Sequence, residues 1–420
     1  MPTVLLVPDL PLERWASMDK YAHRLHDWLE SGEFGLNVRL AAHIGALTRD
    51  SSGRRGSSTE KRSDRRKSFA RWWTQPVDPS RVVLPGPLHG PQQYAARYYF
   101  YPWRVKREAK RVDLVHVLDH SYAHMIERAG RRPVVVTVHD LMPVVVLRSP
   151  TDTWREGWRE GVRTRVLRQA LKSLRQADAY IVGTHWLKHE LATWLGNDKN
   201  IHVVPFGVDR AFFSESATVG GGLGRGEGGG GGARERWRHD WRIPEDAFVV
   251  LHVGSTVDRK NLPLVIQTVA RLRQETDAYL LQVGGRFSVE QEQLIERLDL
   301  RKYVRSVAAA DETTLRRAYR VADVLLFPSL YEGFGFPVLE AFASGLPVVT
   351  SGAGGLKEVG GDAAIVVEGR DPGAYVDALE RLSADSEERE ELIEKGWARA
   401  RQFTWQRTAA MTAEVYKPLF

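Results

Sequence analysis

The residues best suited to chemistry lie in one segment, ADVLLFPSLYEGFGFPVLEAFASGLPVVTS, at positions 322–351. Two carboxylates, Glu332 and Glu340, stand eight positions apart on either side of a Gly-Phe-Gly-Phe-Pro run. Because a carboxylate accepts several hydrogen bonds, each glutamate could hold the hydroxyls of a sugar ring. The glycines between them would let such a ligand come close to the backbone.

The same segment predicts the elements that position these carboxylates, since it has the order strand, loop, helix, strand. Pro337 suits the first turn of a helix and Gly345 suits the position after its end, so the helix is predicted to begin at about Phe336. The N–H groups at a helix start favour anions and hydroxyl oxygens. The residues predicted to contact a ligand there are Gly333, Phe334, Gly335 and Phe336.

A second segment, VLHVGSTVDRKNLPLVIQTVARL at 250–272, repeats the order of strand, loop and helix. Asn261 is its predicted N-cap and Pro263 lies in its first turn. Arg259 and Lys260 fall in the loop, where two cations and a helix N-terminus would stabilise a diphosphate. The alternative is an ordinary solvent-exposed pair of basic residues.

The two segments together resemble the retaining family-four glycosyltransferases, which have the GT-B fold. EGFGFPVLE is similar to the E-x7-E signature of that family, and VGSTVDRKN is similar to its G-x4-RK-N loop. The resemblance implies that Glu332 binds hydroxyls of the transferred sugar and that Glu340 binds the nucleotide ribose. It implies pyrophosphate contacts from the second loop, namely Gly254, Ser255, Arg259 and Lys260. Some relatives have an arginine where this sequence has Ser255.

In the first half of the chain, PVVVTVHDLMP places His139 at the carboxyl end of a predicted strand, where doubly wound sheets bind ligands. The resemblance implies that His139 reaches the donor sugar near the anomeric carbon. A histidine that is hydrogen-bonded in the core is the alternative. The predicted catalytic residues are therefore Glu332, His139, Arg259 and Lys260.

The acceptor is expected to bind to residues of the first half. Ser17 and Asp19 open a predicted helix, and the VHVLDH and VHD motifs end two strands. The residues predicted for the acceptor side are Ser17, Asp19, His116, Asp119, His120 and Asp140. A His/Asp metal site is an alternative for the histidines. No Asp-x-Asp motif occurs in the chain, so we expect transfer without a metal or another cofactor.

The length of 420 residues and the 43% content of hydrophobic residues indicate two globular domains. Short apolar runs alternate with amphipathic stretches, which is typical of parallel strands joined by helices. Six strands are expected in each half: TVLLVP, RVVLP, DLVHVL, PVVVTVHD, AYIVGT and IHVVPFGVD, then FVVLHVGS, AYLLQVGG, VRSVAA, VLLFPS, PVVTS and AAIVV. The predicted fold is α/β, with two Rossmann-like doubly wound domains facing a central cleft.

The predicted domain boundaries follow from changes in composition. Residues 1–210 would form an acceptor-binding domain, with a mobile basic loop at 49–68. A Gly-rich linker would occupy 211–240, and its VGGGLGRGEGGGGGA run at 219–233 would be flexible. Residues 241–400 would form the nucleotide-sugar-binding domain. Residues 401–420 would be a helix at the domain junction.

Basic residues are concentrated in the first half of the chain. Residues 1–200 contain 33 Lys and Arg against 21 Asp and Glu, whereas the remainder contains 27 against 32. This asymmetry favours contact with an acidic partner such as an anionic membrane, and a solvated basic face is the alternative. YAARYYFYPWRVKREAKR at 94–111 could lie at lipid headgroups or could be a helix half-buried on the sheet. No nucleic-acid-binding motif accompanies the charge, so no nucleic-acid partner is expected.

The first residues, MPTVLLVPDL, are expected to form a buried strand rather than a signal peptide, and the chain contains no cysteine. We therefore expect a cytoplasmic protein that contacts the inner face of the membrane peripherally. The predicted reaction moves a mannose- or glucose-type hexose from a UDP- or GDP-sugar to a hydroxyl of a glycan or lipid-linked acceptor, in polysaccharide or glycoconjugate synthesis. The alternatives are a GT-B epimerase or hydrolase of sugar nucleotides and a non-catalytic binder.

A glycosidase is disfavoured by the spacing of the two glutamates. Eight helical steps would separate them by about 12 Å, which exceeds the distance between the two carboxylates of a hydrolase.

Overall fold

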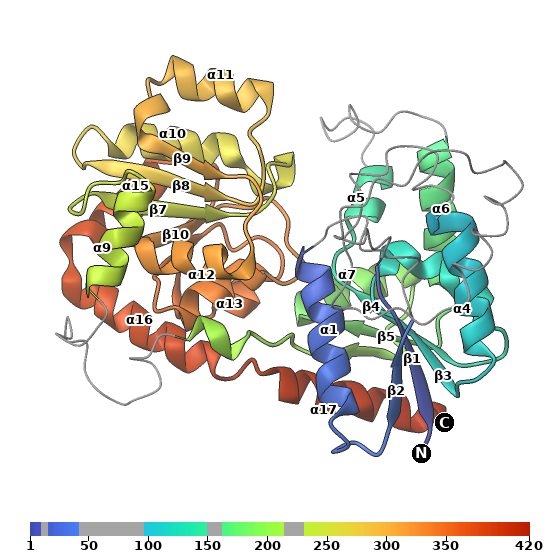
Figure 1. Cartoon of the computed structure of the whole chain (residues 1–420). Coiled ribbons are helices and arrows are strands. Elements are labelled where there is room, and N and C mark those ends of the chain that lie inside the picture. The colour runs from blue at the N-terminus through green and yellow to red at the C-terminus, as the bar shows by residue number, and fades with distance from the viewer. Residues whose placement is uncertain (10–15, 42–95, 149–161, 214–230) are drawn as a thin grey trace, which may run out of the picture. The chain divides into compact units, whose positions relative to one another are not determined.

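The computed structural model describes residues 1–9, 16–41, 96–148, 162–213 and 231–420. Within these residues the chain forms two six-stranded sheets with helices between the strands (Figure 1). Parallel pairings occur in both sheets, for example between β1 and β3 and between β7 and β8. The predicted α/β class with two doubly wound sheets is confirmed.

The first sheet has the strand order β2-β1-β3-β4-β5-β6. Its strands are β1 (Thr3–Val7), β2 (Asn37–Leu40), β3 (Leu114–Val117), β4 (Val134–Val138), β5 (Ala179–Val182) and β6 (Ile201–Val203). Five of these were predicted, whereas β2 was missed because only one side chain of NVRL is buried. The predicted strand RVVLP (81–85) lies outside the described residues. The helices of this half are α1 (Ala16–Glu30), α4 (Tyr101–Ala109), α5 (Met142–Arg148), α6 (Val162–Leu174) and α7 (His185–Leu195).

The second sheet has the order β12-β11-β10-β7-β8-β9, and all six of its strands were predicted. They are β7 (Phe248–Val253), β8 (Ala278–Val283), β9 (Val304–Val307), β10 (Val324–Phe327), β11 (Val348–Thr350) and β12 (Ala364–Val366). The helices are α9 (Gly231–Asp240), α10 (Leu262–Leu272), α11 (Val289–Arg297), α12 (Glu312–Val321), α13 (Phe336–Ala343), α14 (Leu356–Gly360), α15 (Pro372–Ala384), α16 (Ser386–Ala400) and α17 (Trp405–Tyr416).

The core of the second sheet explains why its strands consist of continuous apolar runs. Figure 1 shows α10 and α11 on one face of this sheet and α12 and α13 on the other, so both faces are covered. On α10, Val265, Val269 and Leu272 follow the helical spacing and are fully buried against the sheet. Because the strands are parallel, their carboxyl ends lie along one edge of the sheet.

Contacts divide the chain into two compact units. The first unit comprises residues 1–138, 160–180 and 413–420, and the second comprises residues 139–159 and 181–412. His139 and Asp140 belong to the second unit, although they directly follow β4 of the first. Helix α17 begins in the second unit and ends in the first. The domain boundaries given from the sequence remain predictions.

The expected linker at 211–240 contains regular structure where it is described. Its flexible run was predicted to extend to residue 233, but α9 already begins at Gly231. Basic side chains of α9 hold this helix in place. These residues follow the glycines in the sequence. The predicted mobile loop at 49–68 and residues 214–230 lie outside the described residues.

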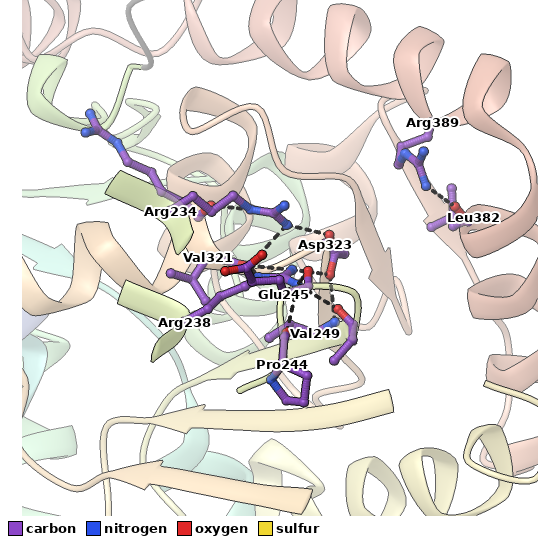
Figure 2. Close-up of polar contacts among 11 residues, drawn as sticks. Arg234, Arg238, Pro244, Glu245, Val249, Val321, Asp323, Leu382 and Arg389 are labelled. Carbon is purple, nitrogen blue, oxygen red and sulfur yellow. Dashed lines mark hydrogen bonds and ion pairs between the residues drawn. The ribbon is translucent and has the colours of Figure 1, made fainter. Parts of the chain in front are cut away.

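Arg238 fastens α9 to the start of the second sheet (Figure 2). Its guanidinium is 2% exposed and donates to the carbonyl oxygens of Val321, Glu245 and Ala247. It also pairs with Asp323 at 2.8 Å, and the same carboxylate oxygen accepts the N–H of Val249 in β7. One buried cation thus joins α9, the end of α12 and the first residues of β7.

Replacing Arg238 with alanine should lower the free energy of unfolding by about 3 kcal/mol, because it leaves Asp323 and several carbonyl groups without their buried donor. Arg234 bonds the same carboxylate at 2.6 Å but is 41% exposed. Its replacement with alanine should cost at most about 1 kcal/mol. Urea denaturation of the two variants measures the difference, and equal losses would contradict this account.

Candidate functional site

Helix α13 begins at Phe336, as the sequence predicted. Gly335 occupies the N-cap with a φ of 113°, a backbone conformation that side chains rarely adopt. Because this N-cap is a glycine, no side-chain hydrogen bond caps the helix. Gly345 follows the helix with a φ of 73°, which also confirms the predicted end. The start of α13 therefore presents its backbone N–H groups beside Glu332.

The loop before α10 is joined directly to the loop before α13. The N–H of Leu330 donates to the carbonyl oxygen of Arg259 at 2.7 Å, and the Asn261 amide donates to the carbonyl oxygen of Pro328 at 3.2 Å. Asn261 holds the predicted N-cap position, but its side chain makes no cap bond. Its backbone is left-handed, with a φ of 55°, and its amide ties the loops together instead. The two predicted motifs thus form one site.

Glu332 is the centre of that site. Its Oε1 accepts from Lys260 Nζ at 2.5 Å and from Arg259 Nη1 at 3.0 Å. Glu332 is 8% exposed and Lys260 is 7% exposed, so water screens this contact little. Burial raises the pKa of Glu332, but attraction to Lys260 and Arg259 outweighs it and lowers the pKa below its ordinary value. The carboxylate is therefore ionised at neutral pH.

Lys260 is held from several sides. Its ammonium lies 4.6 Å from the centroid of the Phe327 ring. A Cβ on Gly254 would lie 3.2 Å from the lysine Cε, so the glycine leaves room for the stem. Burial lowers the pKa of Lys260, and the carboxylates of Glu332 and Asp140 oppose that shift. Asp140 therefore acts electrostatically on this site.

Glu340 is a second buried carboxylate, 6% exposed, in α13. The Tyr319 hydroxyl of α12 donates to its Oε2 at 2.9 Å. Burial and the charge of Glu340 raise the pKa of Tyr319 well above its ordinary value, so this hydroxyl stays protonated. A carboxylate has further acceptor positions, and Glu340 can accept from a ligand hydroxyl in addition.

His139 is placed beside the loop that carries Glu332. The N–H of Leu141 donates to the Tyr331 hydroxyl at 3.1 Å, and a Cβ on Gly333 would lie only 1.9 Å from the carbonyl oxygen of His139. The imidazole is 9% exposed and lies 5.2 Å from the ring of Phe206. The structure thus brings His139 together with the glutamate motif, and its contact with a donor sugar stays a prediction.

Close backbone packing fixes the loop between Tyr331 and α13. The carbonyl oxygen of Glu332 accepts the N–H of Gly355 at 2.8 Å, and that of Gly333 accepts the hydroxyl of Thr184 at 2.9 Å. The two phenylalanines of the loop enter an aromatic cluster with centroid separations of 4.9–6.4 Å. Its members are Phe206, Phe334, Phe336, Phe403 and Trp405. The rings therefore anchor the loop between Tyr331 and α13.

Ser255 is half-buried in the same loop as Gly254, between β7 and the two cations. The described residues contain no group of three or more His, Cys, Asp and Glu side chains placed to hold a metal ion.

The residues predicted for the acceptor side lie in different parts of the structure. Asp140 lies in the second unit and accepts the N–H of Met142 at 3.1 Å, at the start of α5. Ser17 and Asp19 lie in the first turns of α1, and burial raises the pKa of Asp19. Asp119 caps the 3₁₀ helix that begins at His120 by accepting the N–H of Ser121. Both Asp119 and His120 are buried.

His116 is fully buried within the first unit. Its Nδ1 lies 2.6 Å from the Tyr416 hydroxyl and its Nε2 lies 2.8 Å from Thr137 Oγ1, which in turn lies 3.0 Å from the Tyr21 hydroxyl. This chain of hydrogen bonds places His116 in the core, where it connects β3, β4, α1 and the end of α17.

Two sequence families match this chain. Residues 58–212 match the family described as Glycosyltransferase Family 4, and residues 233–399 match the family described as Glycosyl transferases group 1. The chain therefore belongs to the glycosyltransferases with the GT-B fold.

Individual relatives agree with this assignment. The O-antigen chain mannosyltransferase B of Escherichia coli is 34% identical over 173 residues, which are 40% of this chain and 45% of that protein. The D-inositol 3-phosphate glycosyltransferase of Corynebacterium glutamicum (strain R) is 29% identical over 326 residues, 74% of this chain and 73% of that protein. The chain spans about half the length of several of the curated relatives that it matches.

Solved structures share the fold over the whole chain. Sucrose-phosphate synthase from Thermosynechococcus elongatus has a TM-score of 0.71 at 20% identity and covers 100% of this chain and 99% of that one. HepE from Anabaena, in complex with UDP-glucose, has a TM-score of 0.67 at 17% identity with 100% of both chains covered.

Several residues that shape the site were missed from the sequence. The predicted site residues are contacted by Tyr331, Phe327 and Tyr319. Each of these lies in a strand, helix or loop where an aromatic residue is common, so its type does not mark it as part of a site. Thr184 is the N-cap of α7 and bonds the Gly333 carbonyl across 149 positions of sequence. No local pattern indicates such pairings, because they depend on how distant segments meet.

Substituting alanine for Gly333 should separate the glutamate loop from the His139 turn, because the new Cβ would overlap the His139 carbonyl oxygen. We expect a loss of about 2 kcal/mol in the free energy of unfolding and faster amide exchange in both loops. Hydrogen exchange measured by mass spectrometry locates the effect.

Gly232 is the matched control, since a Cβ there meets nothing within 4 Å. Gly232→Ala should leave stability unchanged or raise it by about 0.5 kcal/mol. Native exchange rates in Gly333→Ala would show that the close approach is not required.

Proposed function

We propose that the protein transfers a mannose- or glucose-type hexose from a UDP- or GDP-sugar to a hydroxyl of a glycan or lipid-linked acceptor, with retention at the anomeric carbon. The observation that carries the proposal is the shared contact of Arg259 and Lys260 with Glu332, in two loops bonded to each other. Two cations and an ionised carboxylate within one buried site match a sugar joined to a diphosphate.

Arg259 and Lys260 would stabilise the charge that develops on the departing nucleotide. Their side chains now neutralise Glu332, and a bound diphosphate would offer them a second anionic partner. In a buried site this electrostatic stabilisation is stronger than in water, and it is the largest contribution that the described residues can supply. Gly254 and Ser255 would bring backbone N–H groups to the same phosphates.

Glu332, Glu340 and His139 would orient the donor. The ionised Glu332 accepts hydroxyl protons of the sugar, while Glu340 accepts from the ribose in addition to Tyr319. The start of α13, from Gly333 to Phe336, offers N–H groups to the sugar ring. His139 lies beside Gly333 and would contact the sugar near the reacting carbon. When the donor is already held in a fixed orientation, less entropy is lost on reaching the transition state.

The relatives support an acceptor from glycoconjugate synthesis. One is described as an O-antigen chain mannosyltransferase and others as D-inositol 3-phosphate glycosyltransferases, and these names support the proposed class of acceptor. HepE was solved with UDP-glucose, which supports a nucleotide-sugar donor. We place the reaction at the cytoplasmic side of the membrane.

A thermal-shift panel of UDP-, GDP- and ADP-sugars would identify the donor. The true donor at a hundred times its dissociation constant should add about 2.7 kcal/mol of stability.

Glu332→Gln should reduce kcat by about two to three orders of magnitude, and Lys260→Met by a similar factor. Glu340→Gln should instead raise KM for the donor with a smaller effect on kcat. Turnover is measured as nucleotide release with acceptor present.

Lys302→Met is the matched control for Lys260→Met, because Lys302 is an exposed lysine outside the site. It should retain the rate of the unmodified protein. Native rates in Glu332→Gln, with a native melting curve, would contradict the assigned role. Nucleotide release that needs no acceptor would identify a hydrolase instead.

We propose that no metal ion takes part, because the two cations and the start of α13 occupy the role that a metal would have at the diphosphate. Dialysis against EDTA should leave kcat unchanged, and added Mg²⁺ or Mn²⁺ should not raise it. A loss of activity with EDTA that Mn²⁺ restores would refute metal independence without refuting transfer.

A further inference from the structure

Helix α4 has one face that is built into the first unit. Tyr101, Val105 and Ala109 are buried at successive intervals of four residues. The Tyr101 hydroxyl also donates to the carbonyl oxygen of Pro8 at 2.8 Å. These contacts fix how the helix is rotated about its axis, so its opposite face is held outward.

The outward face has an unusual composition. It begins with Trp103, which is 54% exposed, and continues with the exposed cations Lys106, Arg107, Lys110 and Arg111. We refer to these five residues as the α4 stripe. Positions 103, 107 and 110 are four and three apart, so they lie in one line along the helix. The Arg107 guanidinium is 5.5 Å from the centroid of the Trp103 ring.

Trp103 is the only tryptophan among the described residues whose side chain is exposed. Tyr99 and Phe100, in the short π-helix (Ala96–Phe100) directly before α4, are 67% and 39% exposed. The sequence left open whether the aromatic residues of 94–111 face the core or the outside. The structure divides them, because Tyr101 is in the core and Trp103 is at the surface.

We propose that the α4 stripe binds the surface of a bilayer that contains anionic phospholipids. Tryptophan prefers the level of the headgroups, where its ring contacts the acyl boundary and its N–H remains hydrated. Lysine and arginine close behind it would meet lipid phosphates. The excess of basic residues over acidic residues within positions 1–200 would strengthen the attraction.

A nucleic acid fits this surface less well. The nine residues of α4 span about 14 Å, whereas binding to a nucleic-acid backbone commonly uses six to ten phosphate contacts along a groove. A bilayer offers phosphates in two dimensions and needs no groove. Lipid binding by the α4 stripe is independent of the proposed transfer reaction, because it can be measured without a sugar nucleotide.

The test is flotation of the full chain with vesicles, without donor or acceptor. The protein should float with vesicles of phosphatidylglycerol and phosphatidylcholine, but not with phosphatidylcholine alone, and high salt should release it. Lys106→Gln with Arg107→Gln should weaken binding about twenty-five-fold, at about fivefold for each cation. Trp103→Ser should weaken binding at constant net charge.

Arg168 and Lys172 provide the matched control, since they are exposed cations four residues apart on α6 of the same unit. Arg168→Gln with Lys172→Gln removes the same charge and should leave most of the binding. Melting curves establish that every variant is folded. Equal loss in both double variants, or unchanged flotation of the Lys106 and Arg107 variant, would overturn the proposal. Stripe-dependent binding to RNA but not to vesicles would overturn it as well.

Discussion

The buried contact between the Lys260 ammonium and the Glu332 carboxylate is the interaction that the surrounding residues of the second unit must support. Two charges can remain buried only when they meet at hydrogen-bonding distance and their other groups are satisfied. The chain meets this condition with Arg259 on the same oxygen and the Phe327 ring beneath the ammonium. One backbone hydrogen bond and the Asn261 amide join the two loops and hold the charges at this separation, so the distance does not depend on the charged side chains alone. A site of this kind is organised before any ligand arrives, and little reorganisation is needed when charge develops on a phosphate.

The support around this contact is made mainly of backbone and aromatic rings. Glycines allow the glutamate loop to lie directly against the His139 turn and against the loop before α14. The phenylalanines on either side of Gly335 place their rings in an aromatic cluster, which holds the buried glutamate loop in position. Tyr331 adds a hydrogen bond to the backbone after His139. These contacts all fall within one compact unit, and they explain how a histidine that follows β4 comes to lie beside a loop nearly two hundred positions later.

The elements that carry the site could be predicted from the sequence because each has a strong local signal. Buried parallel strands give continuous apolar runs, and the Pro337 and Gly345 pair marks the two ends of α13. Strand β2 has neither property, and it was missed. Asn261 shows a second limit, since its type and position indicated an N-cap, whereas its amide bonds a carbonyl oxygen sixty-seven positions away. His116 shows a third, because a histidine at the end of an apolar strand can face a ligand or the core. Only the meeting of β3, β4 and the end of α17 decides that it faces the core.

The tight approach of the glycines limits where donor preference can be altered. A side chain at 333, 354 or 355 would meet main-chain atoms within about 2.5 Å, so these positions cannot be used to reshape a binding pocket. Variation must enter through residues whose side chains already extend from the same turns, such as Ser255 or Tyr331. A library built on those positions would keep the close backbone packing of the glycines intact, although changes at Tyr331 would also remove its hydrogen bond to Leu141. In directed evolution of this enzyme, the glycines would therefore be held constant while the neighbouring side chains are diversified.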